Sequence, residues 1–229
     1  MGVNCIYIMI CIFINPRGRI PRVYPWMNVN SPEGRRSPAR KMERCHGLAG
    51  GVSINGFWTE YVNRPDWLLH RIPDNVTFKE ATLTEPLTVV VYALCENTHI
   101  KPDDVVLIQG CGTIGLLAGM LAKTLGAYKV IINGTDVDKK YCLPVARKLG
   151  FDKVINVSER DLKEEIMLLT KGFGVDIVVE ASGSEEAINS AVDLVKKKGS
   201  IIAISEASNP KISFPWNKAI FSACSLFLH

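Results

Sequence analysis

Between Val105 and Ala127 an apolar run meets three closely spaced glycines and a second, longer apolar run, in VVLIQGCGTIGLLAGMLAKTLGA. Glycine inside a regular element costs about 1 kcal/mol relative to alanine, so three at one joint indicate a use. Gly110 would let the chain leave a strand in a tight turn, and Gly112 would leave its backbone open to a close neighbour. Gly115 would let the following helix lie close on the strand. The joint therefore predicts a tight strand-to-helix turn whose backbone at Gly112 is open to close contact with another chemical group.

The segments around this joint alternate between strands and helices from Lys101 onward. Short runs rich in β-branched residues indicate strands, and the segments between them carry caps and end charges typical of helices. Nearly continuous apolar strands joined by helices indicate parallel pairing with both faces covered. We therefore predict an α/β fold with a doubly wound parallel (Rossmann) sheet over residues 101–229. The expected strands are 104–109, 129–133, 153–157, 175–179 and 200–204, and the expected helices are 113–125, 138–149, one capped by Ser158, and 184–195.

Two residues bear on the expected helix 138–149. Asp138 is placed to cap its first turn, because a carboxylate can accept a hydrogen bond from a free backbone amide there. Pro144 lies inside the helix, where it removes a backbone N–H group. We expect Pro144 to kink or shorten this helix.

The spacing of the three glycines matches the G-x-G-x-x-G fingerprint of dinucleotide-binding folds. A strand before it and a helix after it provide the structural context that this fingerprint needs. The helix N-terminus would offer free N–H groups and a partial positive charge to a diphosphate. A P-loop is excluded because no G-K-[ST] follows. The residues predicted to bind the dinucleotide at this turn are Gly110, Gly112, Thr113, Ile114 and Gly115.

An acidic residue near the end of the second strand, about 20 residues beyond the glycines, would complete the fingerprint. Asp136 lies there, and Asp138 is the alternative. A carboxylate that accepts both ribose hydroxyls favours NAD, whereas Lys139 and Lys140 could meet the 2′-phosphate of NADP. We predict NAD and keep NADP open. The cofactor crevice would also be lined by small residues that follow the fourth strand: Ala181, Ser182 and Gly183.

The composition indicates neither nucleic acid nor a membrane as a partner. The net charge is +4, and the densest basic segment, residues 35–44, lacks the interleaved aromatic residues of a nucleic-acid surface. The apolar run Cys5–Ile14 is too short to span a bilayer, which takes about 20 residues, and it lacks the basic start of a signal peptide. We interpret it as a buried strand or as sequence foreign to the fold. Seven cysteines without a C-x-x-C pair favour a reducing, cytoplasmic setting.

The order of motifs resembles the medium-chain dehydrogenase/reductase superfamily. NGFWTEYVNRPDWLLHRIPDNVTFKEATLTEPLTVVVYAL, from Asn55, is similar to its catalytic-domain stretch, which reads roughly G-G-F-A-E-Y, then L-P-D-x-x, then E-P-L. The likeness continues through GCGTIGLLAGMLAKTLGA, LGFDKVINV, GVDIVVEASG and KKGSIIAI. TEPL points to the zinc-type polyol and threonine dehydrogenase branch, which includes sorbitol dehydrogenase. The resemblance implies a partial, mainly β, GroES-like catalytic domain over residues 1–100.

The resemblance also implies an activity. Such enzymes move a hydride between a secondary alcohol or polyol and a nicotinamide cofactor, with Zn²⁺ acting as a Lewis acid on the alcohol oxygen. Glu85 matches an acidic residue at the catalytic zinc. The other zinc groups, a C-G-x-C-x-[ST]-D cysteine and a G-H-E motif, are not found in the sequence, since no histidine is followed by Glu. Cys45 fits one position of the family's structural zinc lobe, but Ser31, Gly34 and Ser37 stand where the other three thiolates belong.

These departures leave alternatives open. Compared with the family, the chain looks short at both ends, so a catalytically inactive, dinucleotide-binding homologue without a zinc site is the alternative to an active dehydrogenase. A zinc-free quinone reductase is a third interpretation, which TEPL and the Cys45 loop disfavour. Family members commonly form dimers or tetramers through an edge strand of the cofactor sheet. If the enzyme is active, we expect a small alcohol or polyol as its substrate.

Overall fold

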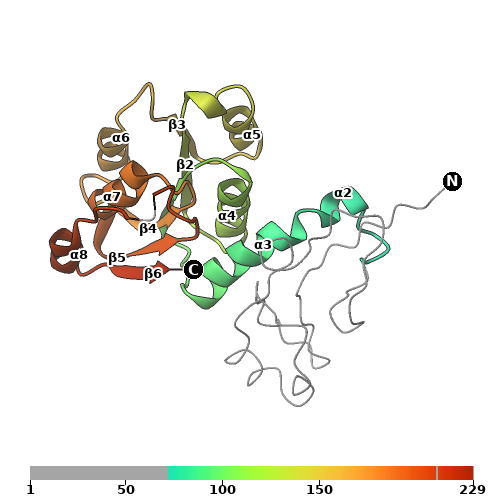
Figure 1. The fold of residues 1–229 in the computed structure, drawn as a ribbon, viewed down its shortest axis with the longest axis horizontal. Helices are drawn as coiled ribbons and strands as arrows, with labels where there is room; N and C mark the ends of the chain where they lie inside the picture. Colours follow the sequence, from blue (N-terminus) through green and yellow to red (C-terminus); the bar gives the residue numbers. More distant parts are fainter. Residues whose placement is uncertain (1–71, 210, 229) are drawn as a thin grey trace, which may run out of the picture. The chain divides into compact units, whose positions relative to one another are not determined.

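The computed structural model describes residues 72–209 and 211–228. The chain divides into two compact units, Met1–Thr88 and Val89–His229. The larger unit is built on a six-stranded sheet in the order β3-β2-β1-β4-β5-β6, and all neighbouring strands pair in parallel (Figure 1). This strand order is that of a doubly wound dinucleotide-binding sheet, so the predicted α/β fold class is confirmed.

Helices cover both faces of this sheet (Figure 1). Helices α4 (Thr113–Thr124) and α5 (Cys142–Lys148) lie on one face, and α6 (Leu162–Leu169), α7 (Glu185–Leu194) and α8 (Trp216–Ser222) lie on the other. The strands are β1 (Val105–Gln109), β2 (Lys129–Gly134), β3 (Lys153–Asn156), β4 (Val175–Glu180), β5 (Val195–Ala203) and β6 (Ser225–Leu228).

The core follows from this two-sided cover. Leu107, Ile131 and Val178 lie at the centre of their strands and are at most 1% exposed. Branched aliphatic residues suit such positions because they fit a pleated strand and have no polar atom to satisfy. The predicted strands 104–109, 129–133, 153–157 and 175–179 therefore form within one residue of their expected bounds.

The carboxyl ends of four neighbouring strands, β3, β2, β1 and β4, carry polar residues instead. Gln109, Asn133, Asn156 and Glu180 are the last or next-to-last residues of β1, β2, β3 and β4, and each is at most 6% exposed. In the sheet register Gln109 lies between Asn133 and Glu180. A buried polar row thus runs along the edge at which the strands enter their following turns.

Two expectations about helix starts were wrong. Asp138 does not cap a helix over 138–149; it ends a 3-10 turn, η3 (Asp136–Asp138), where its carboxylate accepts from the backbone amide of Thr135 at 2.9 Å. Helix α5 starts at Cys142, so Pro144 falls in its first turn, where a missing N–H group breaks no helical hydrogen bond. Pro144 is therefore associated with a shortened helix, as predicted.

Ser158 is likewise not the cap of α6. That role belongs to Asp161, whose side chain accepts from the amide of Glu164 at 2.8 Å. Ser158 instead accepts a hydrogen bond from the Asp136 amide. Strand β5 also begins earlier than residue 200, because Val195 already pairs with Val175 before a register shift.

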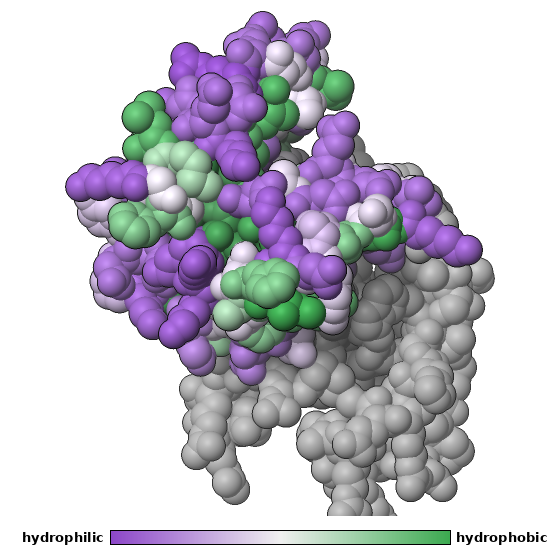
Figure 2. Space-filling view, turned by 90° about the vertical axis from the view of Figure 1, so that its left-hand side faces the viewer, coloured by the Kyte–Doolittle hydropathy of each residue, from purple (hydrophilic) through white to green (hydrophobic). Residues whose placement is uncertain are grey.

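The C-terminal elements α8 and β6 were not predicted, and β6 forms an edge of the sheet. Figure 2 shows this side of the molecule, where apolar patches interrupt a mostly hydrophilic surface. The exposed apolar side chains of the described residues include Phe221 of α8, Leu228 of β6 and Leu168 of α6. Among the described residues, no helix combines the length and apolar character that crossing a bilayer requires.

The described part of the smaller unit begins at residue 72. Helix α2 (Phe78–Ala81) is capped by Thr77, which forms a reciprocal capping box with Glu80. Helix α3 (Thr84–Val91) follows along the chain, and the π-helix after it, η2 (Tyr92–Glu96), belongs to the larger unit. The predictions for Cys5–Ile14, for residues 35–44, for the Cys45 lobe and for most of the 1–100 domain lie outside the described residues.

Candidate functional site

The candidate site lies between β1 and β4, at the topological switch point where the order of the strands reverses. The chain leaves β1 toward α4 on one face and leaves β4 toward α7 on the other. The Ala181 amide donates to the Gln109 carbonyl at 2.9 Å, and the Gly110 amide donates to the Asn133 carbonyl at 3.2 Å. The two turns therefore start side by side at the carboxyl edge, which is where open α/β sheets bind ligands.

Gly110 and Gly115 are explained by close packing. Gly110 has a φ of +97°, and a Cβ atom there would lie 3.0 Å from the Ser182 amide and Cβ. A Cβ atom on Gly115 would overlap the carbonyl oxygen of Gly110. Both residues must be glycine for the turn to fold back onto the start of α4.

Gly112 differs, because no packing explains it. A Cβ atom there would meet nothing within 4 Å, and the backbone is extended, with φ −68° and ψ −176°. Gly112 is the N-cap of α4, and, having no side chain, it makes no capping hydrogen bond to this helix end. The first amides of a helix, here those of exposed Thr113 and half-buried Ile114, lack partners within the helix. The open space therefore faces a backbone suited to an anionic group.

The turn after β4 is braced by Glu180, which is 1% exposed. Its carboxylate accepts hydrogen bonds from the Ser182 amide at 2.8 Å, the Ser182 hydroxyl at 2.5 Å and the Gly183 amide at 3.1 Å. The Ser205 hydroxyl, from the loop after β5, also donates to it. Sequence reasoning selected Ala181, Ser182 and Gly183 but missed Glu180 and Ser205. An acidic residue that ends an otherwise apolar strand was the available signal.

Two buried acceptors in the polar row have no partner. Neither Gln109 Oε1 nor Asn133 Oδ1 meets a hydrogen-bond donor among the described residues. The Gln109 amide nitrogen donates to Ser190 Oγ of α7 at 3.0 Å, which orients that side chain. Buried acceptors usually have a donor from protein, water or ligand, so this edge has capacity for a further polar group.

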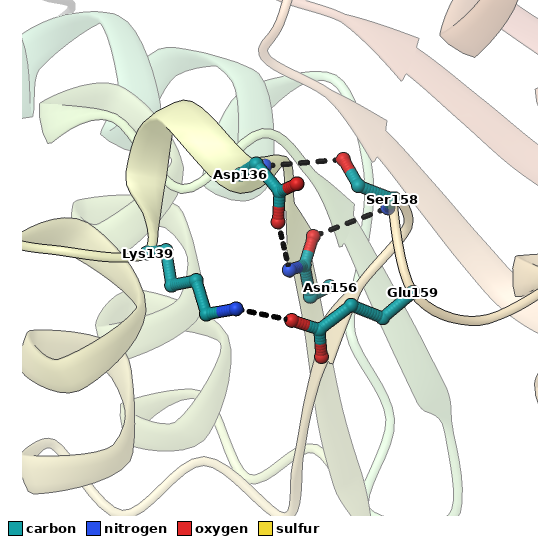
Figure 3. A network of polar contacts seen from close by, with 5 residues as sticks. All are labelled: Asp136, Lys139, Asn156, Ser158 and Glu159. Carbon is teal, nitrogen blue, oxygen red and sulfur yellow. Dashed lines mark hydrogen bonds and ion pairs between the residues drawn. The ribbon is translucent and has the colours of Figure 1, made fainter.

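Asp136 stands at the end of β2 in a small polar network (Figure 3). Its Oδ1 accepts from the Asn156 amide nitrogen at 2.7 Å, and its backbone amide donates to Ser158 Oγ at 3.1 Å. Asn156 Oδ1 in turn accepts from the Ser158 amide at 3.1 Å. The Asp136 carboxylate is thus exposed but oriented. Asp138, the alternative acid, is committed to the Thr135 cap.

The lysines beside Asp136 are occupied elsewhere. Lys139 Nζ lies 2.6 Å from Glu159 Oε1, and this hydrogen-bonded ion pair raises the pKa of Lys139 and lowers the pKa of Glu159. Lys140 Nζ lies 4.9 Å from the centroid of the Tyr141 ring. Of the residues predicted around the ribose, Asp136 therefore offers an available charge in this structure.

Cys111, between two of the glycines, is 1% exposed. Burial raises the pKa of its thiol to about 12, and the neighbouring Asp138 carboxylate and Cys142 thiol add to the effect.

At the opposite, amino edge of the sheet lies a hollow of ≈ 650 Å³, whose lining includes Val105, Asp176 and Lys196. That hollow is remote in the fold from the predicted site.

Glu85 lies in the first turn of α3 and is exposed. Within residues 72–209 and 211–228 it belongs to no cluster of three side chains that could hold a metal. The described residues therefore do not assemble the catalytic zinc site that the resemblance implies, and we derive no chemical step through that zinc.

Strand order, switch point and open glycine turn together define a Rossmann-type fold of the dehydrogenase kind. The zinc-binding dehydrogenase family matches residues 113–227. The chain belongs to this family, within the medium-chain dehydrogenase/reductase superfamily, as its motifs predicted.

Curated relatives include polyol and L-threonine dehydrogenases. The chain is 37% identical over 170 residues to a sorbitol dehydrogenase of Halalkalibacterium halodurans, covering 74% of this chain and 49% of the relative. It is 33% identical over 162 residues to a D-arabitol-phosphate dehydrogenase of Enterococcus avium, covering 71% and 46%. The chain thus spans about half the length of the curated relatives it matches.

Solved structures share the fold. An Escherichia coli oxidoreductase of unknown specificity matches with a TM-score of 0.75 and 26% identity, over 90% of this chain and 58% of that one. A Sinorhizobium meliloti protein bound to NADP matches with a TM-score of 0.73 and 25% identity, over 85% and 58%.

Proposed function

We propose that this chain binds a nicotinamide dinucleotide at the β1–β4 switch point and forms the cofactor-binding part of an alcohol or polyol oxidoreductase. The observation that carries the proposal is the open space at Gly112, at the uncapped start of α4. The names of the relatives as sorbitol and arabitol-phosphate dehydrogenases support the substrate class. The bound nicotinamide would supply the hydride chemistry, and the protein would supply binding and orientation.

Each predicted residue has a role in this proposal. The backbone of Gly112, Thr113 and Ile114 binds the diphosphate, because free amides and the helix dipole favour an anion. Gly110 and Gly115 shape the turn. The small residues after β4, Ala181, Ser182 and Gly183, line the crevice. Glu180 holds Ser182 and Gly183 in place by accepting their hydrogen bonds.

We propose NAD rather than NADP as the preferred cofactor. The oriented Asp136 carboxylate can accept both hydroxyls of the adenosine ribose, and it would repel a 2′-phosphate. Lys139 is held by Glu159 and Lys140 lies over Tyr141, so neither is free to offset that repulsion without giving up its contact.

The remainder of the proposal concerns the whole enzyme. By the family resemblance Glu85 would lie at the catalytic zinc, whose other ligand motifs are not found in this sequence, and a small alcohol or polyol would be the substrate. Four described cysteines, Cys95, Cys111, Cys142 and Cys224, are free thiols, which supports a reducing, cytoplasmic setting. The relatives are named as dehydrogenases, so the comparisons give no support to the alternative of an inactive homologue.

Fluorescence titration of the full chain with NADH and NADPH tests the proposal. We expect saturable binding of NADH and weaker binding of NADPH. Asp136→Asn should narrow this preference, because it removes the charge and keeps the size of the side chain. Asp103→Asn, at an exposed aspartate before the amino end of β1, is the matched control and should leave both affinities unchanged. Absence of saturable binding by either nucleotide would overturn the proposal.

A further inference from the structure

Three metal-binding side chains meet behind the glycine turn. Cys111, Asp138 and Cys142 each offer one ligand atom, and these atoms all lie within 4.8 Å of one another. They come from three places in the fold: the turn after β1, the 3-10 turn after β2, and the first residue of α5. Cys111 is buried and the other two are half-buried.

Gly134, the last residue of β2, makes this meeting possible. A Cβ atom at Gly134 would overlap Cys111 Sγ and would lie 2.9 Å from Asp138 Oδ2. Any larger residue would therefore displace two of the three groups. The side chain of Cys111 accordingly points toward the end of β2, whereas the space beside Gly112 remains open.

The donor set selects the kind of cation. Two sulfur atoms and one carboxylate oxygen suit zinc, whereas magnesium and calcium favour oxygen ligands alone. With both thiols deprotonated the three groups would carry three negative charges, which a divalent cation would largely offset. The nearby lysines have other partners, since Lys139 pairs with Glu159 and Lys140 lies over Tyr141.

We propose that Cys111, Asp138 and Cys142 bind a zinc ion, with water as the fourth ligand. Each thiol gives up its proton on binding, because the thiolate is the ligand form. The ion joins the glycine turn to the start of α5. This site is separate from the proposed dinucleotide site and from the zinc implied by Glu85, and it does not depend on either.

Cobalt binding to the full chain tests the proposal, because Co²⁺ occupies zinc sites and its thiolate bonds give a charge-transfer absorption. Cys5, Cys11 and Cys45 are first replaced by serine, which removes the thiols outside the described residues. This background should bind one Co²⁺ with the thiolate absorption, and zinc should displace the cobalt.

Variants in this background identify the ligands. Cys142→Ser should weaken zinc binding, measured by competition with a chromophoric chelator, by roughly 100-fold or more, because loss of a ligand exceeds the 10–100-fold effect of losing its supporting contacts. Asp138→Asn keeps an oxygen acceptor for Thr135 but loses the charge, so it should also bind zinc more weakly. Cys224→Ser, on the opposite face of the sheet, is the control and should bind as the background does.

Three results would overturn the proposal. The background could show no thiolate absorption with cobalt, or Cys142→Ser could retain it in full. Mass spectrometry could also find Cys111 and Cys142 joined as a disulfide in protein purified without reductant, which would leave neither thiol to bind a metal. Circular dichroism of each variant separates loss of a ligand from loss of folding.

Discussion

Gly112→Val separates the binding role of the glycine turn from its folding role. The backbone at Gly112 is extended, a conformation that valine favours, and its Cβ atom would meet no neighbour within 4 Å. Gly112 is the N-cap of α4, where valine is less favourable than glycine, so we expect the free energy of unfolding to fall by only about 0.5–1 kcal/mol. The added side chain would instead occupy the space in which a diphosphate must come within about 2.9 Å of the backbone amides.

The expected loss of affinity follows from those lost contacts. If the diphosphate can no longer reach the first amides of α4, the affinity for NADH should fall by at least about 100-fold, which corresponds to ~2.8 kcal/mol. Gly115→Ala should instead lower the stability of the fold, because its methyl group would overlap the Gly110 carbonyl oxygen. We expect that variant to lose about 1–3 kcal/mol of stability, the usual cost of overpacking.

Urea denaturation and NADH fluorescence titration of both variants measure these effects. Thr124→Val, at the exposed other end of α4, is the control for a valine in this helix and should change neither quantity much. If Gly112→Val binds NADH as well as the parent chain does, the diphosphate does not bind beside Gly112. If Gly112→Val proves as unstable as Gly115→Ala, valine is not accommodated without a clash at this position, contrary to the open space described above.

Two further perturbations test the electrostatics of the site. Glu180→Gln should lower the free energy of unfolding by about 1–3 kcal/mol in urea denaturation, because the amide cannot accept all the hydrogen bonds of the buried carboxylate; exposed Glu186→Gln should have little effect. The pKa of Glu159 is lowered by Lys139, so their pair is formed above the unfolded-state pKa of Glu159 and is lost as the pH falls through its lower folded-state pKa. Lys139→Met should therefore raise the pKa of Glu159 in an NMR titration, and an unchanged pKa would contradict the pairing.

The sheet could be predicted because each strand and each turn is specified by its own short stretch of sequence. Buried strands between two helical layers must be apolar and β-branched, and the turns between them carry glycine or polar residues. The three glycines were assigned correctly to one strand-to-helix turn for the same reason. The helix after β2 was misplaced because two capping patterns compete there. The sequence offers Asp138 to either a helix or a 3-10 turn, and only the partner, Thr135, decides between them.

The details of the site depend on contacts between distant residues. Asn156 and Ser158 orient Asp136 from the next strand, and Glu180 receives Ser205 from the loop after β5. No spacing along the chain predicts these pairs, because the parallel topology brings them together. The proposed zinc ligands are brought together in the same way, by the register of β1 beside β2 and by the missing side chain of Gly134.

The buried row of Gln109, Asn133, Asn156 and Glu180 has a consequence for how the sheet assembles. If one strand slid along its neighbour by a single residue, an amide or carboxylate would leave its partners and an aliphatic side chain would take its place. Such a mispaired sheet would leave uncompensated polar groups in the interior, at a cost of about 1–3 kcal/mol each. The row thus favours a single register of β1, β2, β3 and β4 during folding. The loops that follow these four strands therefore begin at defined positions along the edge of the sheet.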